Sequence, residues 1–371
     1  MEMNTGHPPA QNCTSWRLFF EGDDYYASLR QDIARARSSV CIESYIFQDD
    51  EIGLEIIDAL VERASQGLLI RVLVDGVGSY GLSERTIARM RSAGIEFAVF
   101  RPIRFHRIFS PRSRRRNHRK LVVIDREIFY VGGMNIAREN SRRAVGRECW
   151  RDSMLRLEGA IAKSALESFM RVWNYVNQRR FRFPRRFAEV PGQLELIENI
   201  PRFRRKFRKI YRNYIRGATS RVWIESAYFI PTRSFRKALI RSAKRGADVR
   251  ILVSKESDVF AARLASRATY GAFLSNGIRI FEYRPRFVHS KSMIVDEEIS
   301  IVGSANLDHR SFLHDLEISV VAHRRDLNHA LTAQFKADLL DADEVTRKDW
   351  ENRKFTDRLF ERFFYLFRYF L

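Results

Sequence analysis

The sequence has few cysteines and no long apolar run. Its three cysteines, Cys13, Cys41 and Cys149, are odd in number and fit neither a metal-site spacing nor a disulfide framework. We therefore expect reduced thiols, in the core or on the surface of a cytosolic protein. No apolar stretch approaches the roughly 20 residues needed to cross a bilayer. Residues 1–15 are polar and lack the apolar segment of a secretory signal.

Acidic residues are in short supply. The chain has 45 acidic and 66 basic residues, a formal net charge of +21 at pH 7. Such a charge predicts attraction to a polyanion, either nucleic acid or an anionic membrane surface, and leaves the fold open. No helix-turn-helix, zinc-finger or ribonucleoprotein signature accompanies it. Nucleic acid is therefore the less favoured partner.

One motif occurs twice in the 371 residues. Both copies follow H-x-K-x4-D with an Asn 17 residues after the His: His118, Lys120, Asp125 and Asn135 in the first half, and His289, Lys291, Asp296 and Asn306 in the second. A duplicated set at matched spacing indicates one active site assembled from two half-sites.

The duplication extends beyond the motif. Residues 40–47 and 222–229 are β-branched and aromatic runs that predict strands, and a helical pattern follows each. Further strands are expected at 70–75, 95–100, 249–254 and 278–283. Strands and helices alternate in each half, so we predict an α/β fold with two sandwich domains. Because strand side chains alternate, His and Lys of each motif should point to the same face.

The composition divides the chain into five parts. We expect a flexible N-terminus at 1–16, a first domain at 17–178, a basic linker at 179–200, a second domain at 201–347 and a basic amphipathic tail at 348–371. The tail has Phe at helical spacing with Arg and Lys beside it, which is typical of a helix in a membrane interface. The alternative is a terminal helix packed on the second domain.

The repeated residues suit phosphodiester chemistry. Lysines and asparagines can neutralise and bind the non-bridging oxygens. One neutral His can attack phosphorus, and the other can protonate the leaving alkoxide. Asp152 and Glu317 lie downstream of the motifs and are candidates to orient the histidines. No further His and carboxylate cluster demands a metal, so no cofactor is expected.

These residues resemble the phospholipase D superfamily over about residues 18–345. Longer phrases are similar to bacterial cardiolipin synthases, in particular the short form without N-terminal transmembrane helices. They include Arg116-Asn-His-Arg-Lys-Leu-Val-Val-Ile-Asp125, Gly132-Gly-Met-Asn-Ile136, Glu282-Tyr-Arg-Pro-Arg-Phe-Val-His-Ser-Lys291 and Ser304-Ala-Asn-Leu-Asp-His-Arg-Ser-Phe312.

The resemblance implies a phospholipase D fold, in which two α/β/α domains are related by a pseudo-twofold axis with the active site between them. It implies that His118 is the nucleophile and His289 the general acid and base. Catalytic roles then extend to Lys120, Asp125, Lys291 and Asp296. Supporting or phosphate-binding roles are expected for Asn135, Asn306, Ser304, Asp152 and Glu317. Gly133 stands where the second half has Ser304, so the half-sites are not equivalent.

The resemblance further implies a phosphatidyltransferase that makes cardiolipin from two phosphatidylglycerol molecules, as a peripheral protein on the cytoplasmic face of the bacterial inner membrane. Three alternatives use some of the same features: a phospholipid hydrolase or a transferase with another alcohol, a nucleic-acid phosphodiesterase, and a membrane scaffold. The sequence leaves the acceptor alcohol, the acyl preference and the oligomeric state open.

Overall fold

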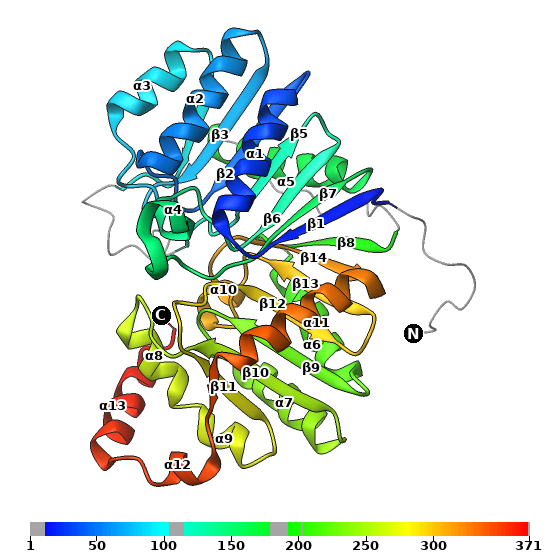
Figure 1. Ribbon diagram of the computed structural model, residues 1–371, viewed down its shortest axis with the longest axis vertical. Helices are drawn as coiled ribbons and strands as arrows, with labels where there is room; N and C mark the ends of the chain where they lie inside the picture. The colour runs from blue at the N-terminus through cyan, green and yellow to red at the C-terminus, as the bar shows by residue number, and fades with distance from the viewer. Residues whose placement is uncertain (1–11, 104–114, 179–191, 202, 370–371) are drawn as a thin grey trace.

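The computed structural model describes residues 12–103, 115–178, 192–201 and 203–369. Its strands form two mixed sheets, and helices cover both (Figure 1). The fold predicted from the sequence, two α/β domains, is confirmed.

The first sheet has seven strands in the order β1-β7-β6-β5-β2-β3-β4. Their bounds are β1 (Ser15–Phe19), β2 (Ser39–Ser44), β3 (Leu69–Asp75), β4 (Glu96–Phe100), β5 (Leu121–Ile124), β6 (Ile128–Gly132) and β7 (Met154–Glu158). The helices of this half are α1 (Gly22–Arg35), α2 (Glu51–Ser65), α3 (Glu84–Ser92), α4 (Arg142–Val145) and α5 (Ile161–Asn177), with 3₁₀ turns η2 (Arg138–Asn140) and η3 (Gly146–Glu148).

The second sheet has eight strands in the order β15-β11-β10-β9-β12-β13-β14-β8. Their bounds are β8 (Leu194–Asn199), β9 (Arg221–Ser226), β10 (Asp248–Ser254), β11 (Arg279–Tyr283), β12 (Lys291–Val295), β13 (Ile299–Gly303), β14 (Glu317–His323) and β15 (Ala342–Glu344). The helices are α6 (Arg204–Gly217), α7 (Arg233–Lys244), α8 (Phe260–Arg267), α9 (Tyr270–Leu274), α10 (His309–Leu313), α11 (Arg325–Leu340), α12 (Arg347–Glu351) and α13 (Phe355–Leu366).

The two sheets repeat one topology. The run β7-β6-β5-β2-β3-β4 matches β14-β13-β12-β9-β10-β11 in order, and in both sheets the last three strands are parallel. The sequence duplication is therefore a duplication of structure.

Among the described residues, three large apolar cores hold these layers together. One core fills the space between the first sheet and α1–α3, and another fills the space between the second sheet and α6, α7 and α9. The third is shared by the facing sides of both sheets and includes Phe169 and Trp173 of α5 and Phe335 of α11. This common core fixes one half against the other, because close-packed interiors resist sliding.

Two predicted boundaries need correction. Residues 12–16 are not a flexible N-terminus, because Asn12 and Cys13 are buried and Ser15 begins an edge strand. The predicted linker at 179–200 cannot extend past Gln193, because β8 pairs with β14 inside the second sheet. Residues 1–11 and 179–191 lie outside the described residues. All three cysteines, which lie within the described residues, are buried, and none of them forms a disulfide.

Candidate active site

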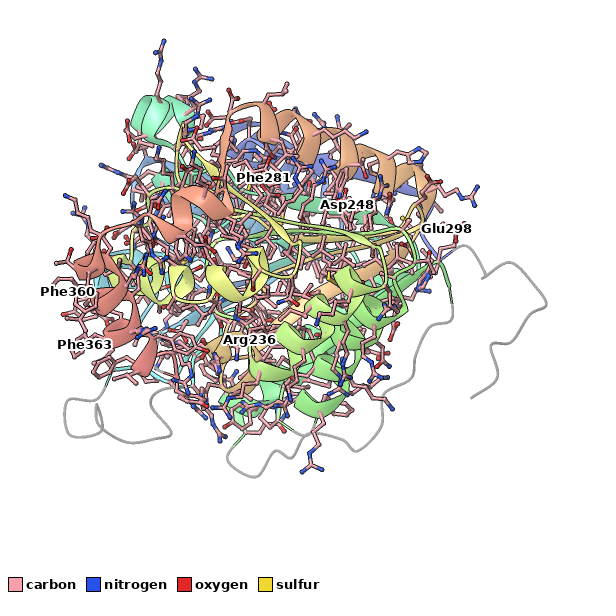
Figure 2. All side chains as sticks on the ribbon, turned by 90° about the horizontal axis from the view of Figure 1, so that it is seen from below. Arg236, Asp248, Phe281, Glu298, Phe360 and Phe363 are labelled. Atoms are coloured by element: carbon pink, nitrogen blue, oxygen red, sulfur yellow. The ribbon has the colours of Figure 1, made fainter. Side chains whose placement is uncertain are left out.

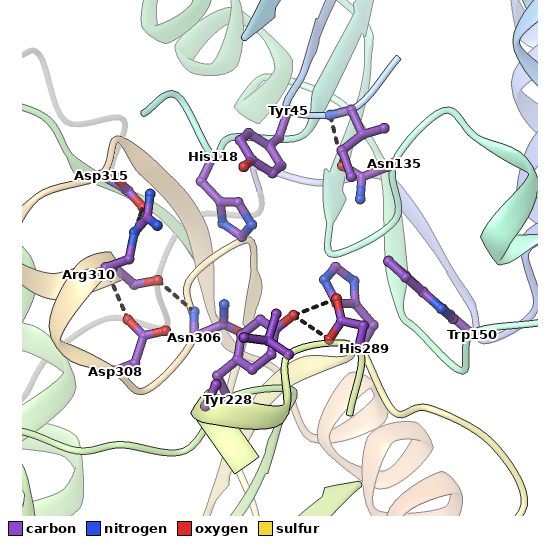
Figure 3. A pocket seen from close by; sticks show the side chains of 15 residues that line it. Tyr45, His118, Asn135, Trp150, Tyr228, His289, Asn306, Asp308, Arg310 and Asp315 are labelled. Atoms are coloured by element: carbon purple, nitrogen blue, oxygen red, sulfur yellow. Dashed lines mark hydrogen bonds and ion pairs between the residues drawn. The ribbon is translucent and has the colours of Figure 1, made fainter. Parts of the chain in front are cut away.

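The two motifs meet in one cavity between the halves. The cavity has a volume of about 350 Å³, and both His118 and His289 line it together with Asn135 and Asn306. Figure 3 shows the two imidazoles pointing into this space from opposite sides. The prediction that two half-sites form one site is therefore supported by the geometry of the fold.

The backbone just before each motif strand is not part of that strand, although the sequence predicted that it would be. The sequence predicted that His118 lies on the motif strand, but β5 begins only at Leu121. The backbone before the strand pairs with the other half instead: His118 N donates to Leu316 O at 3.0 Å, and Leu316 N donates to Arg116 O at 2.9 Å. These bonds satisfy backbone groups that would otherwise be buried without partners.

The second motif has the equivalent pair of backbone hydrogen bonds between the halves. His289 N donates to Arg151 O at 2.7 Å, and Arg151 N donates to Phe287 O at 2.8 Å. The segment that carries each histidine is therefore held to the opposite half by two backbone hydrogen bonds, one at the histidine and one two residues before it. A small shift of one domain against the other would move both imidazoles.

The orienting carboxylates are also exchanged between the halves. Glu317 of the second half lies 3.1 Å from Nδ1 of His118, and Asp152 of the first half lies 2.6 Å from Nδ1 of His289. An Nδ1–H that donates to a carboxylate leaves Nε2 as the free ring nitrogen, directed at the cavity. The sequence identified both acids as candidates, but it did not show that each one orients the histidine of the opposite half.

Ser304 and Gly133 explain the asymmetry of the half-sites. The hydroxyls of Ser304 and Ser311 both donate to Glu317, so its oxygens act as acceptors. At the matching place in the first half, a Cβ on Gly133 would lie 2.1 Å from Oδ1 of Asp152. Glycine is therefore required there, because any side chain would displace the carboxylate that orients His289.

Burial and neighbouring cations keep both imidazoles neutral. Burial, helped by Lys120 and Lys291, lowers the pKa of His118 well below its ordinary value. Burial and Lys291 lower the pKa of His289 to about 4, although Asp152 opposes this shift. A neutral imidazole is the nucleophilic form.

The two lysines are buried beside the histidines. Each ammonium donates to the backbone carbonyl two residues before it, Lys120 to His118 O at 2.8 Å and Lys291 to His289 O. Burial lowers the pKa of both lysines, and the neighbouring Lys291 lowers that of Lys120 further. Two cations held close together form a place that an anion would stabilise.

Aromatic and polar side chains complete the cavity wall. The ring of Tyr45 lies 4.9 Å from that of His118, and the ring of Trp150 lies 4.8 Å from that of His289. Tyr228 donates to Asp258, and Arg310 pairs with Asp315. Sequence reasoning did not assign these six residues to the site. Arg310 lies in one of the phrases that carry the family resemblance, whereas a single aromatic such as Trp150 has no spacing signal.

Among the predicted catalytic residues, Asp125 and Asp296 lie at a different place from the histidines, and we propose a structural role for them. Each follows the end of the motif strand opposite to the histidine, and neither lines the cavity. Asp125 accepts from the backbone N–H groups of residues 37–39, and Asp296 accepts from those of residues 219–221. Both aspartates therefore tie the turn after the motif strand to the start of the neighbouring strand.

Asp125→Ala is expected to lower stability without lowering the turnover of the folded enzyme. The change leaves several backbone donors without a partner, which costs about 2 kcal/mol. Because hydrogen bonds lower the pKa of Asp125, its contribution is present above pH 4 and is lost as pH falls. Thermal unfolding should show a gap from wild type at pH 7 that closes below about pH 4. A turnover loss in fully folded Asp125→Ala would return this residue to the catalytic set.

Two further observations bear on binding. Within the described residues, no group of three or more His, Cys, Asp or Glu side chains is arranged to hold a metal ion. In the same part of the chain, no helix is both long enough and apolar enough to cross a membrane.

Comparisons with known proteins agree with the duplicated fold. A family model described as "Cardiolipin synthase, PLD-like domain" matches residues 29–173 and 211–339. A probable cardiolipin synthase of Bacillus subtilis is 33% identical over 95% of this chain and 71% of its own length. Cardiolipin synthase 1 of Bacillus anthracis is 32% identical over 96% of this chain and 73% of its own length.

Among solved structures, phosphatidylserine synthase of Haemophilus influenzae superposes with a TM-score of 0.77 at 13% identity, over 98% of this chain and 97% of that one. Polyphosphate kinase of Porphyromonas gingivalis superposes with a TM-score of 0.64 at 15% identity, over 94% of this chain and 53% of that one. At these identities the likeness is one of fold.

Proposed function

The chain belongs to the family of cardiolipin synthases with phospholipase D-like domains, and on that premise we propose that it joins two phosphatidylglycerol molecules into cardiolipin and releases glycerol. The observation that carries the proposal is the pair of imidazoles in one cavity, each held by a carboxylate from the opposite half. The enzyme class is a phosphatidyltransferase of the phospholipase D superfamily.

In the first step, Nε2 of His118 attacks the phosphorus of one phosphatidylglycerol. A P–N bond forms and the P–O bond to the headgroup glycerol breaks. The departing oxygen takes its proton from Nε2 of His289. Because the free His289 is neutral, that proton has to be bound as the phosphodiester binds; the anion offsets the cations that lower the pKa of His289.

In the second step, the terminal headgroup hydroxyl of a second phosphatidylglycerol enters the place that glycerol left. Its proton goes to His289, its oxygen attacks phosphorus, and the P–N bond breaks to free His118. The products are one cardiolipin and one glycerol from two phosphatidylglycerols. Splitting the transfer into two displacements lets one site serve both alcohols.

The cations and amides around the cavity suit a phosphodiester. Lys120, Lys291 and Arg310 supply positive charge, and Asn135 and Asn306 line the wall as neutral groups. Oδ1 of Asn306 is buried without a partner, which leaves an acceptor for a substrate hydroxyl. A cavity of about 350 Å³ is at the small end for ligand pockets, so it suits a headgroup and leaves acyl chains outside.

The proposal extends to where the protein works. The acyl chains of both substrates lie in a bilayer, so we place the protein as a peripheral enzyme on an anionic membrane, at the cytoplasmic face. Its net charge of +21 supports this placement.

Lipid mass spectrometry tests the reaction. Purified protein incubated with phosphatidylglycerol vesicles in EDTA is expected to yield cardiolipin and free glycerol in equal amounts. Phosphatidic acid in place of cardiolipin would show that water is the acceptor, and the protein would then be a hydrolase. Turnover that needs an added divalent cation would contradict the two-histidine mechanism as written. DNA cleavage without lipid turnover would favour the nucleic-acid alternative.

A further inference from the structure

The helix α13 buries a charged side chain and exposes its apolar ones, the reverse of the usual orientation of a surface helix. A surface helix normally buries its apolar stripe and exposes its charges. In α13 the most buried side chain is Glu361, at 1% exposure, whereas Phe360 and Phe363 are 58% and 52% exposed. The exposed apolar side chains recur at helical spacing: Phe355, Leu359, Phe360, Phe363, Leu366 and Phe367. We call these six residues the outer stripe.

A buried ion-pair cluster fixes this orientation. Glu361 accepts from Arg267 of α8 at 3.3 Å and from Arg353 at 3.2 Å. Arg267 also pairs with Glu282, and the guanidinium of Arg353 stacks 3.6 Å above the ring of the buried Trp350. Turning α13 to bury the outer stripe would break these pairs and leave buried charges unpartnered, which is strongly unfavourable. The exposure of the stripe is therefore built into the fold.

The outer stripe is connected to the mouth of the catalytic cavity. α13 packs against α8 through Phe364, whose ring lies 6.1 Å from that of Phe260. Phe260 is 61% exposed, and the preceding Val259 is both exposed and part of the cavity wall. Exposed apolar surface thus runs from α13 over Phe260 to the cavity. Figure 2 shows Phe360 and Phe363 at the edge of the molecule.

The far end of the tail also reaches the site. The ring of Tyr369 lies 4.8 Å from that of His309. His309 directly follows Asp308, which lines the cavity. The tail therefore contacts the cavity region at two places, through the packing of Phe364 on α8 and through Tyr369 on His309.

The charges around the stripe favour an anionic surface as its partner. Lys354 and Arg362 are exposed beside the outer stripe. The positive charges of Arg236 of α7 and of Arg368 both lower the pKa of His309. The helices α6 and α7 carry many Arg and Lys and no Asp or Glu, so they add to the cationic surface of the second half. Exposed Phe flanked by cations is the pattern of a helix that lies in the headgroup region of an anionic bilayer.

We propose that the outer stripe of α13 inserts into the headgroup region of an anionic bilayer and thereby holds the mouth of the catalytic cavity, at Val259 and Phe260, against the lipid surface. Insertion stands on the stripe and its charges alone. Delivery of lipid to the cavity rests on the proposed function. The sequence left open whether the tail packs on the domain or inserts in a membrane. The structure shows that one side of α13 packs on α8 and that the other side is exposed.

The test compares two double variants. Phe360→Ser with Phe363→Ser removes the centre of the stripe, and Leu69→Ser with Leu340→Ser removes exposed leucines elsewhere as a matched control. Sedimentation with phosphatidylglycerol-containing vesicles is expected to show at least about a 30-fold loss of partitioning for the Phe variant, from the burial of two aromatic side chains. The control should bind as wild type. Equal binding of all three proteins would overturn the proposal.

Activity separates insertion from catalysis. On a short-chain phosphatidylglycerol dissolved as monomers, the Phe variant should turn over as wild type, whereas on vesicles it should lose most of its activity. Wild type that binds vesicles but turns over neither substrate would refute the proposed function and leave insertion standing. If the Phe variant instead breaks up a dimer and binds vesicles normally, the stripe is a contact between copies of this chain.

An environment-sensitive fluorophore tests the placement of the cavity. Labels at Phe363→Cys and Val259→Cys should both shift to the blue when vesicles are added, and a label at Leu340→Cys should not. A shift at Phe363→Cys without one at Val259→Cys would show that the helix inserts but that the cavity mouth faces away from the lipid, which would overturn that part of the proposal.

Discussion

His118→Ala is expected to lower turnover of phosphatidylglycerol by about 10⁴-fold or more, because it removes the atom that forms the covalent bond. His289→Ala should cost about 10²–10⁴-fold, the usual contribution of a general acid and base. Both losses should appear in kcat, since neither imidazole is needed to hold the acyl chains. The measurement is cardiolipin formation at saturating substrate.

His323→Gln is the matched control for these variants. His323 ends β14 and its ring pairs with Tyr214, outside the cavity. It should retain wild-type turnover, and all three variants should unfold at similar temperatures. Turnover within tenfold of wild type in folded His118→Ala would refute the nucleophile assignment.

The second large effect is expected for the two exchanged carboxylates. Asp152→Asn and Glu317→Gln should each lower kcat by about 10²–10⁴-fold, because a neutral amide neither fixes the Nδ1–H tautomer nor stabilises a positive imidazole. The effect on KM should be small. Glu127→Gln, an exposed residue in the turn between β5 and β6, is the control.

Titration separates positioning from a merely structural role. Asp152 opposes the lowering of the His289 pKa, so Asp152→Asn should lower that pKa further. Because Asp152 contacts His289 and not His118, NMR of the histidine rings should show the titration of His289 moved and that of His118 little changed. A loss of activity with both titrations unaltered would show that Asp152 acts on something other than His289.

These predictions depend on which half supplies each group, and the sequence could not show this. The spacing of two copies located His118, His289, Asn135 and Asn306, because a repeat marks equivalent positions without any knowledge of contacts. The exchange of Asp152 and Glu317 depends on how the two sheets face each other across a common core. Such long-range pairing has no local signal.

Asp125 shows a different limit of motif reasoning. It has the same fixed distance from its histidine as Asp296 has in the other copy, so spacing alone gives both a catalytic role. Spacing records that a residue is required and not what it contacts. In the structure, each carboxylate accepts backbone hydrogen bonds at the far end of the strand, and we infer that it is needed there for stability.

For the tail, the sequence predicted an amphipathic helix but not which side of it packs on the protein. Helical spacing of Phe predicted an amphipathic helix, and α13 forms. The side that faces the protein carries Glu361, which pairs with two arginines, together with Phe364, which packs on α8. A pattern of apolar residues cannot identify the packed face when a buried ion pair competes with it.

Rapid-quench mass spectrometry of the wild-type protein mixed with phosphatidylglycerol would detect the covalent intermediate on His118. We expect a burst of one glycerol per active site before cardiolipin appears, together with a phosphatidyl group on the peptide that contains His118. Release of glycerol and cardiolipin together, with no burst and no adduct on His118, would contradict the covalent mechanism.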